Sequence, residues 1–141
     1  MNTLKIGDYL PEFECLNDKG DSIKSSDYKG KKLIVFFYPR ANTPGCTAEA
    51  CNLSENFDNL NKEGYSILGV SCDKVETQSK FSNKFSFKYP LLADTDKNLV
   101  KLFGVWGPKN FMGRKYEGIH RMTFIFDENS VVSRVIEKVN T

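Results

Sequence analysis

The sequence predicts an α/β fold in which helices flank a central β-sheet of mixed direction. Two apolar runs, at residues 33–37 and 66–71, are typical of strands buried on both faces. A helical pattern follows each run, and the chain closes with a strand, a turn and a second strand over residues 121–139. Strands that alternate with helices and end in such a hairpin favour a mixed sheet with helices on its faces.

The first half of the chain contains clear turn and helix signals. Residues 17–20, Asn-Asp-Lys-Gly, predict a turn that pairs residues 13–16 with residues 21–24 in a small hairpin. One helical turn is expected over residues 25–28, closed by Gly30. After the first buried strand, apolar residues recur at steps of three and four, and Gly64 is expected to end this helix. The apolar positions are Ala50, Leu53, Phe57 and Leu60.

The second half continues with shorter elements. Residues 74–85 predict a surface helix whose Val75, Phe81 and Phe85 face inward, and residues 90–92 predict a short strand. Asp94 or Thr95 is expected to cap a helix that runs through Phe103 and stops at Gly104. Residues 106–118, rich in glycine and aromatic residues, are expected to be irregular. The closing hairpin consists of a strand at 121–127, a turn at 127–130 and a partner strand at 131–139.

Length and charge limit the function classes. The 141 residues predict a single domain over 1–141 with a real core. The formal net charge of +2 comes from 20 basic and 18 acidic residues, and this balance argues against a nucleic-acid surface. Neither a signal-peptide pattern nor a membrane span is evident, so a cytoplasmic location with reduced thiols is expected. Four cysteines in such a protein indicate catalytic or redox chemistry more readily than a structural disulfide framework.

The junction between the first buried strand and its helix is the strongest candidate site. Thr43 is a good N-cap, Pro44 suits the first helical position, and Gly45 lets the backbone come close to a neighbouring group. Cys46 then lies in the first turn, where free N–H groups and the helix dipole favour a thiolate. This context favours a reactive thiol at Cys46 over a buried cysteine without chemistry.

Cys46 and Cys51 are five residues apart. On an unbroken helix this spacing separates their Cα atoms by about 7.5 Å along the axis and roughly 140° around it. Such a pair cannot form a disulfide while the helix is intact. Either the bond never forms, with Cys51 a small buried residue, or the first turns unwind to make it. The neighbouring Cys46 favours the redox interpretation.

The remaining candidates have weaker signals. Cys15 and Cys72 lie in expected strand or strand-end positions, and both are interpreted as structural. A metal site built from the four cysteines and His120 is disfavoured, because structural zinc sites typically use pairs at Cys-x2–4-Cys spacing and the chain has no second pair. Arg121 opens an apolar strand and therefore needs an anion, for which a thiolate and the carboxylate of Glu49 are equally good candidates.

The segment Pro39-x-x-x-Thr43-x-x-Cys46, followed by Cys51 and much later by Arg121, resembles the active-site signature of the peroxiredoxins. The similarity is greatest to the Q-type, or bacterioferritin-comigratory-protein, branch, and it spans nearly the whole chain. Further similar segments are Gly7-Asp8 with Pro11 and Phe13, Asp27-Tyr28, Gly30-Lys31-Lys32, residues 90–94, residues 104–107, and Gly118-Ile119 before Arg121.

This resemblance implies a thioredoxin-like fold and a cofactor-free, metal-free thiol peroxidase for hydrogen peroxide and organic hydroperoxides, with an antioxidant role. It implies that Cys46 is the peroxidatic cysteine and that Cys51 is the resolving cysteine of an intramolecular Cys46–Cys51 disulfide. Thr43 would hydrogen-bond the peroxide, Arg121 would stabilise the thiolate and the developing oxyanion, and Pro39 would shield the pocket from water. Thioredoxin or a glutaredoxin-like protein would be the reductant, and a monomer or weak homodimer is expected.

The sequence departs from that branch at its end. Members generally continue past the final strand into a helix that packs on the sheet, whereas this sequence stops at Asn140-Thr141. We therefore expect a fold without the usual C-terminal helix and a sheet face that exposes apolar side chains. A truncation, a naturally short form and a covering subunit are all consistent with this expectation.

Two other functions compete with a peroxidase. A general thiol–disulfide oxidoreductase of the same fold is disfavoured, because that class uses Cys-x-x-Cys rather than cysteines five residues apart. A redox sensor or binding module would use the same thiol switch to change partners. Peroxide consumption coupled to a thioredoxin system distinguishes the peroxidase from both.

Overall fold

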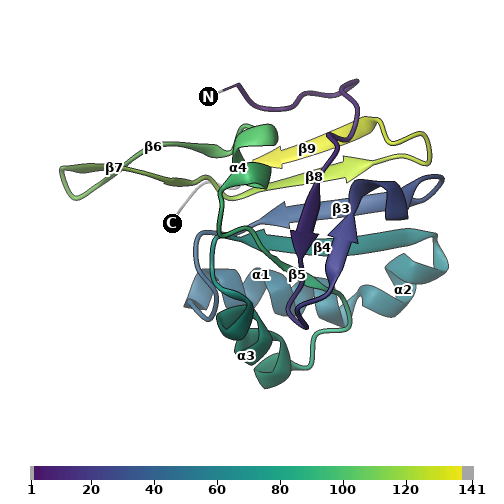
Figure 1. The fold of residues 1–141 in the computed structure, drawn as a ribbon, viewed down its shortest axis with the longest axis horizontal. Coiled ribbons are helices and arrows are strands. Elements are labelled where there is room, and N and C mark those ends of the chain that lie inside the picture. Colours follow the sequence, from purple (N-terminus) through teal and green to yellow (C-terminus); the bar gives the residue numbers. More distant parts are fainter. Residues whose placement is uncertain (1, 138–141) are drawn as a thin grey trace.

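The computed structural model describes residues 2–137, whose main sheet has five strands in the order β5-β4-β3-β8-β9 (Figure 1). β3 is parallel to β4 and β4 is parallel to β5, whereas β8 is antiparallel to both β3 and β9. The predicted mixed α/β fold is therefore confirmed. The strands are β3 (Lys32–Phe37), β4 (Tyr65–Ser71), β5 (Leu91–Ala93), β8 (Met122–Phe126) and β9 (Val132–Glu137).

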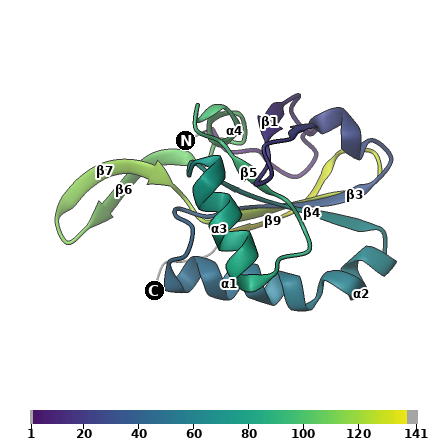
Figure 2. The same cartoon turned by 60° about the horizontal axis from the view of Figure 1, so that its bottom comes forward.

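Helices cover both faces of this sheet. Figure 2 shows α1 and α2 along one face and α4 on the other, together with the short η1 turn and the β1 strand. None of the helices in residues 2–137 combines the length and apolar character needed to cross a membrane. The helices are η1 (Ser25–Tyr28), α1 (Pro44–Glu55), α2 (Phe57–Lys62), α3 (Val75–Phe85) and α4 (Asn98–Leu102).

Most expected elements are present, with shifted ends. The first hairpin is β1 (Glu14–Leu16) paired with β2 (Ser22–Lys24), as predicted. The helix expected to end at Gly64 is divided at Asn56 into α1 and α2, and Gly64 follows α2 with a φ of 88°. The strand expected at 131–139 is β9 over its described part, and residues 138 and 139 lie outside the described residues.

The helix expected from Asp94 or Thr95 begins later, at Asn98. The Asp94 carboxylate nevertheless accepts hydrogen bonds from the N–H groups of Leu99 and Val100, at 3.1 and 2.9 Å. Asp94 therefore satisfies the free donors at the start of α4 from outside the helix. Gly104 follows the helix with a φ of 68°, as its predicted role as a stop requires.

The prediction of an irregular segment at 106–118 was wrong. β6 (Trp106–Phe111) and β7 (Arg114–Ile119) form an antiparallel hairpin that projects from the molecule (Figure 1). Met112 and Gly113 form its turn, and both have positive φ values. Most side chains on β7 are exposed. The hairpin therefore lacks the alternation of buried and exposed residues by which a strand is recognised in a sequence. Backbone pairing defines it instead. We call this hairpin the β6–β7 arm.

The core consists of two apolar clusters, one on each face of the main sheet. Phe37, Phe103 and Phe124 pack together on the α4 face, with ring centroids 4.9–5.9 Å apart. On the face covered by α1 and α3, Phe36 packs against Tyr38 and Tyr89. Alternate residues of β3 therefore supply both clusters, as expected for a strand buried on both faces.

β9 ends at the last described residue, and within residues 2–137 the expected exposed apolar sheet face is not observed. On the α1 side of β8, Ile125 is half-buried and packs against the adjacent core cluster. Its cross-strand partner on β9 is the exposed Arg134, and the buried Thr123 precedes it on the same face. Polar residues therefore alternate with apolar ones here. The exposed large apolar residues lie outside the main sheet: Ile6, Tyr9, Leu16, Leu102, Phe111, Met112 and Tyr116.

A buried polar network links the carboxyl ends of β3 and β4 to α3. The Gln78 amide donates to the Ser71 hydroxyl at 2.9 Å and to the Leu92 carbonyl at 2.7 Å, and its oxygen accepts from the Tyr38 hydroxyl. Burial raises the pKa of Tyr38 well above its usual value, so that hydroxyl stays protonated. The sequence analysis assigned the inward face of this helix to apolar residues and missed Gln78, which is fully buried.

We expect Gln78→Leu to lower the free energy of unfolding by about 3 kcal/mol, because it leaves the Tyr38 hydroxyl and the Leu92 carbonyl buried without their partner. Urea denaturation measures this loss. Adding Tyr38→Phe to that variant removes a group that is already unpaired. Its cost should therefore be smaller than in the wild type, and equal costs in both backgrounds would contradict the network.

Candidate active site

The candidate site lies where three segments of the fold meet. β3 and β4 are parallel, so the segments after them, which begin at Tyr38 and Cys72, emerge at the same end of the sheet. β8 is antiparallel to β3, so Arg121, the residue just before β8, lies at that end too. The β6–β7 arm projects from this end (Figure 1). Crevices beyond the carboxyl ends of parallel strands are the usual place for sites in α/β folds.

Cys46 is the third residue of α1 and is fully buried. Arg121 donates a hydrogen bond from Nη2 to the Cys46 Sγ at 3.1 Å. A positive charge beside a sulfur at a helix N-terminus favours the thiolate over the thiol. The structure thus joins the predicted thiol and the predicted arginine, 75 residues apart in the sequence, in one contact.

Arg121 also contacts the second candidate anion. Its Nη1 lies 3.4 Å from Oε1 of Glu49, and both side chains are largely buried. The guanidinium therefore bridges the thiol and the carboxylate, so both predicted partners are correct. Glu49 and Cys46 are on neighbouring turns of α1, which fixes the direction in which Arg121 points.

Gly45 leaves the space that the guanidinium occupies. A Cβ atom on Gly45 would lie 3.3 Å from Nη2 of Arg121, closer than a relaxed contact. A larger side chain at this position would therefore press on the atom that donates to Cys46. This agrees with the prediction that Gly45 permits a close approach.

Thr43 occupies the N-cap position of α1, but its side chain makes no capping hydrogen bond. Its hydroxyl instead donates to the Arg40 carbonyl at 3.0 Å. The predicted helix start is thus correct, and the predicted capping by the Thr43 side chain is not. Because its proton is directed to Arg40, the Thr43 oxygen retains lone pairs that can accept a hydrogen bond.

A cavity of about 780 Å³ opens beside Cys46. Pro39, Thr43, Cys46 and Arg121 all line it, so four of the five predicted site residues share one pocket. The β6–β7 arm supplies the opposite wall, which the sequence analysis did not anticipate. These additional lining residues are Trp106, Lys109, Phe111, Tyr116, Glu117, Gly118 and Ile119. Trp106, Gly118 and Ile119 fall in segments that resemble the family, and the Met112-Gly113 turn is the signal that a hairpin joins these segments.

Asp73 holds the loop that precedes α1. One carboxylate oxygen, Oδ2, accepts hydrogen bonds from the Ala41 N–H and from the Ser71 hydroxyl, both at 2.7 Å. Ser71 in turn belongs to the Gln78 network. The loop that carries Pro39 and Thr43 is therefore fastened to β4 through polar groups. Sequence reasoning did not identify Asp73.

Cys51 lies on the same unbroken α1 as Cys46, and both thiols are free. It does not line the Cys46 pocket. Burial, and then the nearby Glu55 carboxylate, raise the pKa of the Cys51 thiol. One buried hydrogen bond restrains this part of the helix, from the Tyr89 hydroxyl to the Ala50 carbonyl at 2.7 Å. The structure therefore shows an intact α1 in which the two thiols are not bonded.

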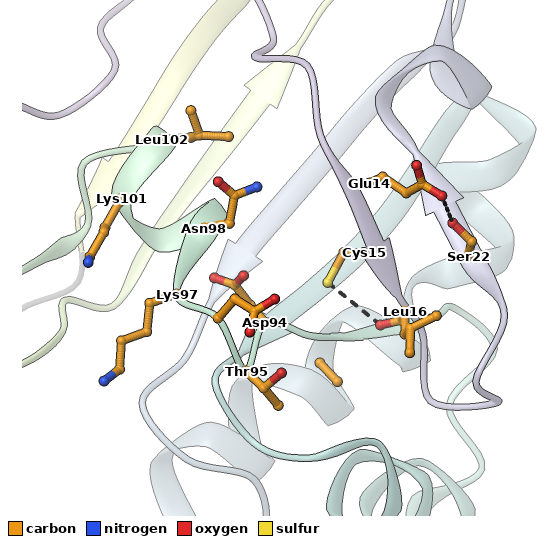
Figure 3. A pocket seen from close by; sticks show the side chains of 12 residues that line it. Glu14, Cys15, Leu16, Ser22, Asp94, Thr95, Lys97, Asn98, Lys101 and Leu102 are labelled. Atoms are coloured by element: carbon orange, nitrogen blue, oxygen red, sulfur yellow. Dashed lines mark hydrogen bonds between the residues drawn. The ribbon is translucent and has the colours of Figure 1, made fainter.

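Cys15 lies in a second cavity, of about 750 Å³, between β1 and the segment from Asp94 to Leu102 (Figure 3). Its thiol donates to the Leu16 carbonyl at 3.7 Å. Burial and the nearby Asp94 carboxylate raise the pKa of Cys15 to about 12. The same two causes raise the pKa of Cys72 to about 11. Both thiols are therefore protonated at neutral pH, although Cys72 also lines the Cys46 pocket.

Within residues 2–137, no group of three or more His, Cys, Asp or Glu side chains is arranged to hold a metal ion. His120, the one histidine, has its Nε2 atom 3.0 Å from the Pro108 carbonyl on the β6–β7 arm. It thus joins the arm to the start of β8, as a strand-end residue.

A family model, similar sequences and solved structures all relate this chain to the same group of proteins. Residues 6–135 match the model of the AhpC/TSA family. Peroxiredoxin Bcp of Escherichia coli K12 is 43% identical over 141 residues, covering 100% of this chain and 90% of the relative. Peroxiredoxin Bcp of Bacillus subtilis is 38% identical over 137 residues, covering 97% and 87%.

Solved structures resemble the fold over nearly its whole length. A cysteine-to-serine mutant of Xylella fastidiosa PrxQ aligns with a TM-score of 0.92 at 28% identity, covering 99% of this chain and 89% of that one. The Xanthomonas campestris bacterioferritin comigratory protein, studied for its alkyl peroxide reduction activity, aligns with a TM-score of 0.85 at 33% identity, covering 91% and 82%. The expected thioredoxin-like fold is thereby confirmed.

We predict that Cys15 and Cys72 react slowly with iodoacetamide at pH 7 in a Cys46→Ser/Cys51→Ser variant. Because their pKa values are raised to about 12 and 11, the thiolate fraction should increase about tenfold per pH unit from pH 7 to 9. Peptide mass spectrometry measures the rates. The urea-unfolded variant serves as the control and should level off near pH 9. A plateau at or below pH 9 in the folded protein would contradict the assignment.

Proposed function

The chain belongs to the AhpC/TSA family and is a peroxiredoxin related to the Bcp and PrxQ proteins, and we propose that Cys46 is its peroxidatic cysteine. The observation that carries this proposal is the 3.1 Å contact between the Arg121 guanidinium and the Cys46 sulfur at the start of α1. Cys51 has no comparable cation at its sulfur among the contacts of residues 2–137. Cys15 and Cys72 have thiols that burial keeps protonated.

In the first step, the Cys46 thiolate attacks one oxygen of the hydroperoxide. A sulfur–oxygen bond forms, the oxygen–oxygen bond breaks, and the leaving oxygen departs as hydroxide or alkoxide, which takes up a proton to give water or an alcohol. The sulfur is oxidised to a sulfenic acid, and the peroxide is reduced by two electrons. The same step accommodates hydrogen peroxide and alkyl hydroperoxides, because the second substituent remains on the leaving oxygen.

Arg121 stabilises the thiolate before the attack and the negative charge that develops on the leaving oxygen. Glu49 holds the guanidinium in place through the 3.4 Å ion pair. Thr43 accepts a hydrogen bond from the peroxide O–H, because its own proton is directed to the Arg40 carbonyl. Pro39 lines the pocket without offering an N–H group, which limits access of water to the sulfur.

In the second step, the Cys51 thiol condenses with the sulfenic acid to form a Cys46–Cys51 disulfide and release one water molecule. Both residues lie on unbroken α1, where their spacing forbids the bond. The start of α1 must therefore unwind in each cycle. Two features favour this motion: Thr43 provides no side-chain cap, and only Cys46, Glu49 and Ala50 of this helix are buried.

An external dithiol protein, thioredoxin or a glutaredoxin-like donor, then reduces the disulfide by thiol–disulfide exchange. The unwound segment presents the disulfide to that donor. This cycle belongs in the cytoplasm, where such donors keep thiols reduced, and it requires only a monomer or weak homodimer. It needs no cofactor, nucleic acid or membrane.

Cysteine variants test the assigned roles. We expect Cys46→Ser to lose peroxidase activity completely, because the nucleophile is gone. Cys51→Ser should consume about one equivalent of peroxide and stop, because its sulfenic acid lacks a resolving partner. A thioredoxin-coupled NADPH assay measures turnover, and dimedone labelling measures the sulfenic acid.

Cys72→Ser is the matched control, because Cys72 lines the pocket but has no assigned role. It should keep turnover near the wild-type rate. Full thioredoxin-linked turnover by Cys51→Ser would show that another thiol has the resolving role. Loss of turnover in Cys72→Ser would then identify Cys72 as that thiol.

Unwinding of α1 is tested with Tyr89→Phe. This variant removes the hydrogen bond to the Ala50 carbonyl and keeps the buried ring, so disulfide formation should accelerate about threefold to tenfold. Stopped-flow measurement after one equivalent of peroxide gives the rate. Hydrogen exchange should show weaker amide protection over residues 46–51 in the oxidised wild type than in the reduced one. Equal protection in the two states would contradict the unwinding.

A further inference from the structure

Lys109 is a basic residue of the Cys46 pocket with no role in the chemistry described so far. It lies on β6, is half-buried, and lines the cavity together with Cys46 and Arg121. Its ammonium donates a hydrogen bond to the Ile119 carbonyl at 2.8 Å. Ile119 ends β7, two residues before Arg121, so this bond holds the Lys109 side chain across the arm on the side of the site.

We propose that Lys109 is a second cation of the peroxidatic pocket, which acts with Arg121 to stabilise the Cys46 thiolate and the negative charge on the leaving peroxide oxygen. The part concerning the peroxide rests on the proposed function. The part concerning the thiolate depends only on the shared pocket. Preorganised cations that face a developing charge in a partly water-excluded site lower the barrier of such a step.

A positive charge on Lys109 is unfavourable in this pocket unless an anion lies nearby. Partial burial lowers its pKa, the positive charge of Arg121 lowers it further, and the Cys46 sulfur opposes both effects. Lys109 shares the cavity with the guanidinium groups of Arg121 and Arg40. Cations that face one cavity repel one another, and each loses part of its hydration there. A Cys46 thiolate in the same cavity offsets part of this repulsion, so the charged sulfur and the cations that line the cavity stabilise one another.

The carboxylates near the pocket have other partners. Asp73 binds the Ala41 N–H and the Ser71 hydroxyl, and Glu49 pairs with Arg121. Glu117 accepts a hydrogen bond from the Trp106 indole at 2.9 Å. Within residues 2–137, no carboxylate lies at ion-pair distance from the Lys109 ammonium. The other titratable or charged residues lining the cavity are Arg40, Cys72 and Tyr116.

The β6–β7 arm explains why the second cation is placed here. The arm projects beyond the main sheet (Figure 1). Residues of both its strands, Lys109 among them, line the pocket. The His120 ring contacts the Pro108 carbonyl, and the Lys109 ammonium contacts the Ile119 carbonyl, so two side chains tie the base of the arm together. Lys109 thus gives the arm a direct electrostatic effect on the site.

Three substitutions at Lys109 separate charge from structure. Lys109→Met removes the charge and the hydrogen bond, Lys109→Gln keeps a donor for the Ile119 carbonyl without the charge, and Lys109→Arg keeps both. Lys115→Met is the matched control, because Lys115 is an exposed residue of the same arm that does not line the cavity. Circular dichroism and the urea midpoint establish that each variant is folded.

The first readout is the pH dependence of Cys46 alkylation, followed on the Cys46 peptide by mass spectrometry. We expect the midpoint to rise by roughly half to one pH unit in Lys109→Met and in Lys109→Gln. It should be unchanged in Lys109→Arg and Lys115→Met. If Lys109→Met does not fold, the Lys109→Gln result decides. An unchanged midpoint in the folded neutral variants would overturn the proposal.

The second readout is kcat/KM for hydrogen peroxide with a thioredoxin system. The neutral variants should lose about threefold to tenfold at pH 7 and recover part of this loss at higher pH. A loss in Lys109→Arg as large as in Lys109→Met would indicate a structural role and overturn the proposal. If the wild type consumes no peroxide, the peroxidase assignment fails, and the alkylation midpoint still decides whether Lys109 stabilises the thiolate.

Discussion

The bridge from Arg121 to Cys46 and Glu49 is the interaction on which the site depends. One guanidinium contacts the sulfur at 3.1 Å and the carboxylate at 3.4 Å, so it connects the start of β8 to two turns of α1. Buried charges are tolerated when they are paired, and this pairing directs the remaining positive field at the sulfur. The order of the strands makes this contact possible, because antiparallel β8 begins at the end of the sheet where β3 ends.

The site combines a firmly held loop with a helix whose first turn has few restraints. Asp73, Ser71 and Gln78 form a chain of buried hydrogen bonds that fastens the loop before α1 to the sheet. The helix itself has fewer restraints, because α1 begins without a side-chain cap and keeps only Cys46, Glu49 and Ala50 buried. Different contacts hold the loop and the helix start, so the unwinding that the proposed cycle requires would leave the loop in place.

Sequence reasoning succeeded where the pattern is local. Neighbouring residues predict the two buried strands, the helix start at Thr43-Pro44 and the place of Cys46 in the first turn. The structure confirms each of these predictions. It failed at the β6–β7 arm, whose exposed strands carry no hydrophobic period and pair only through their backbone. It also missed Gln78, because a polar residue on a helix is ordinarily solvent-exposed, and only the packing of α3 on the sheet buries it.

The sequence by itself determined the α/β class, the place of Cys46 in the first turn of a helix and the spacing that prevents Cys46 and Cys51 from bonding within that helix. These follow from short-range geometry: strand and helix periods, helix capping and the pitch of one helix. Only the tertiary structure decided that Arg121 faces both the sulfur and Glu49, and that the arm brings Lys109 into the pocket. Such contacts join residues far apart in the chain, and they depend on strand order and packing, which no local pattern encodes.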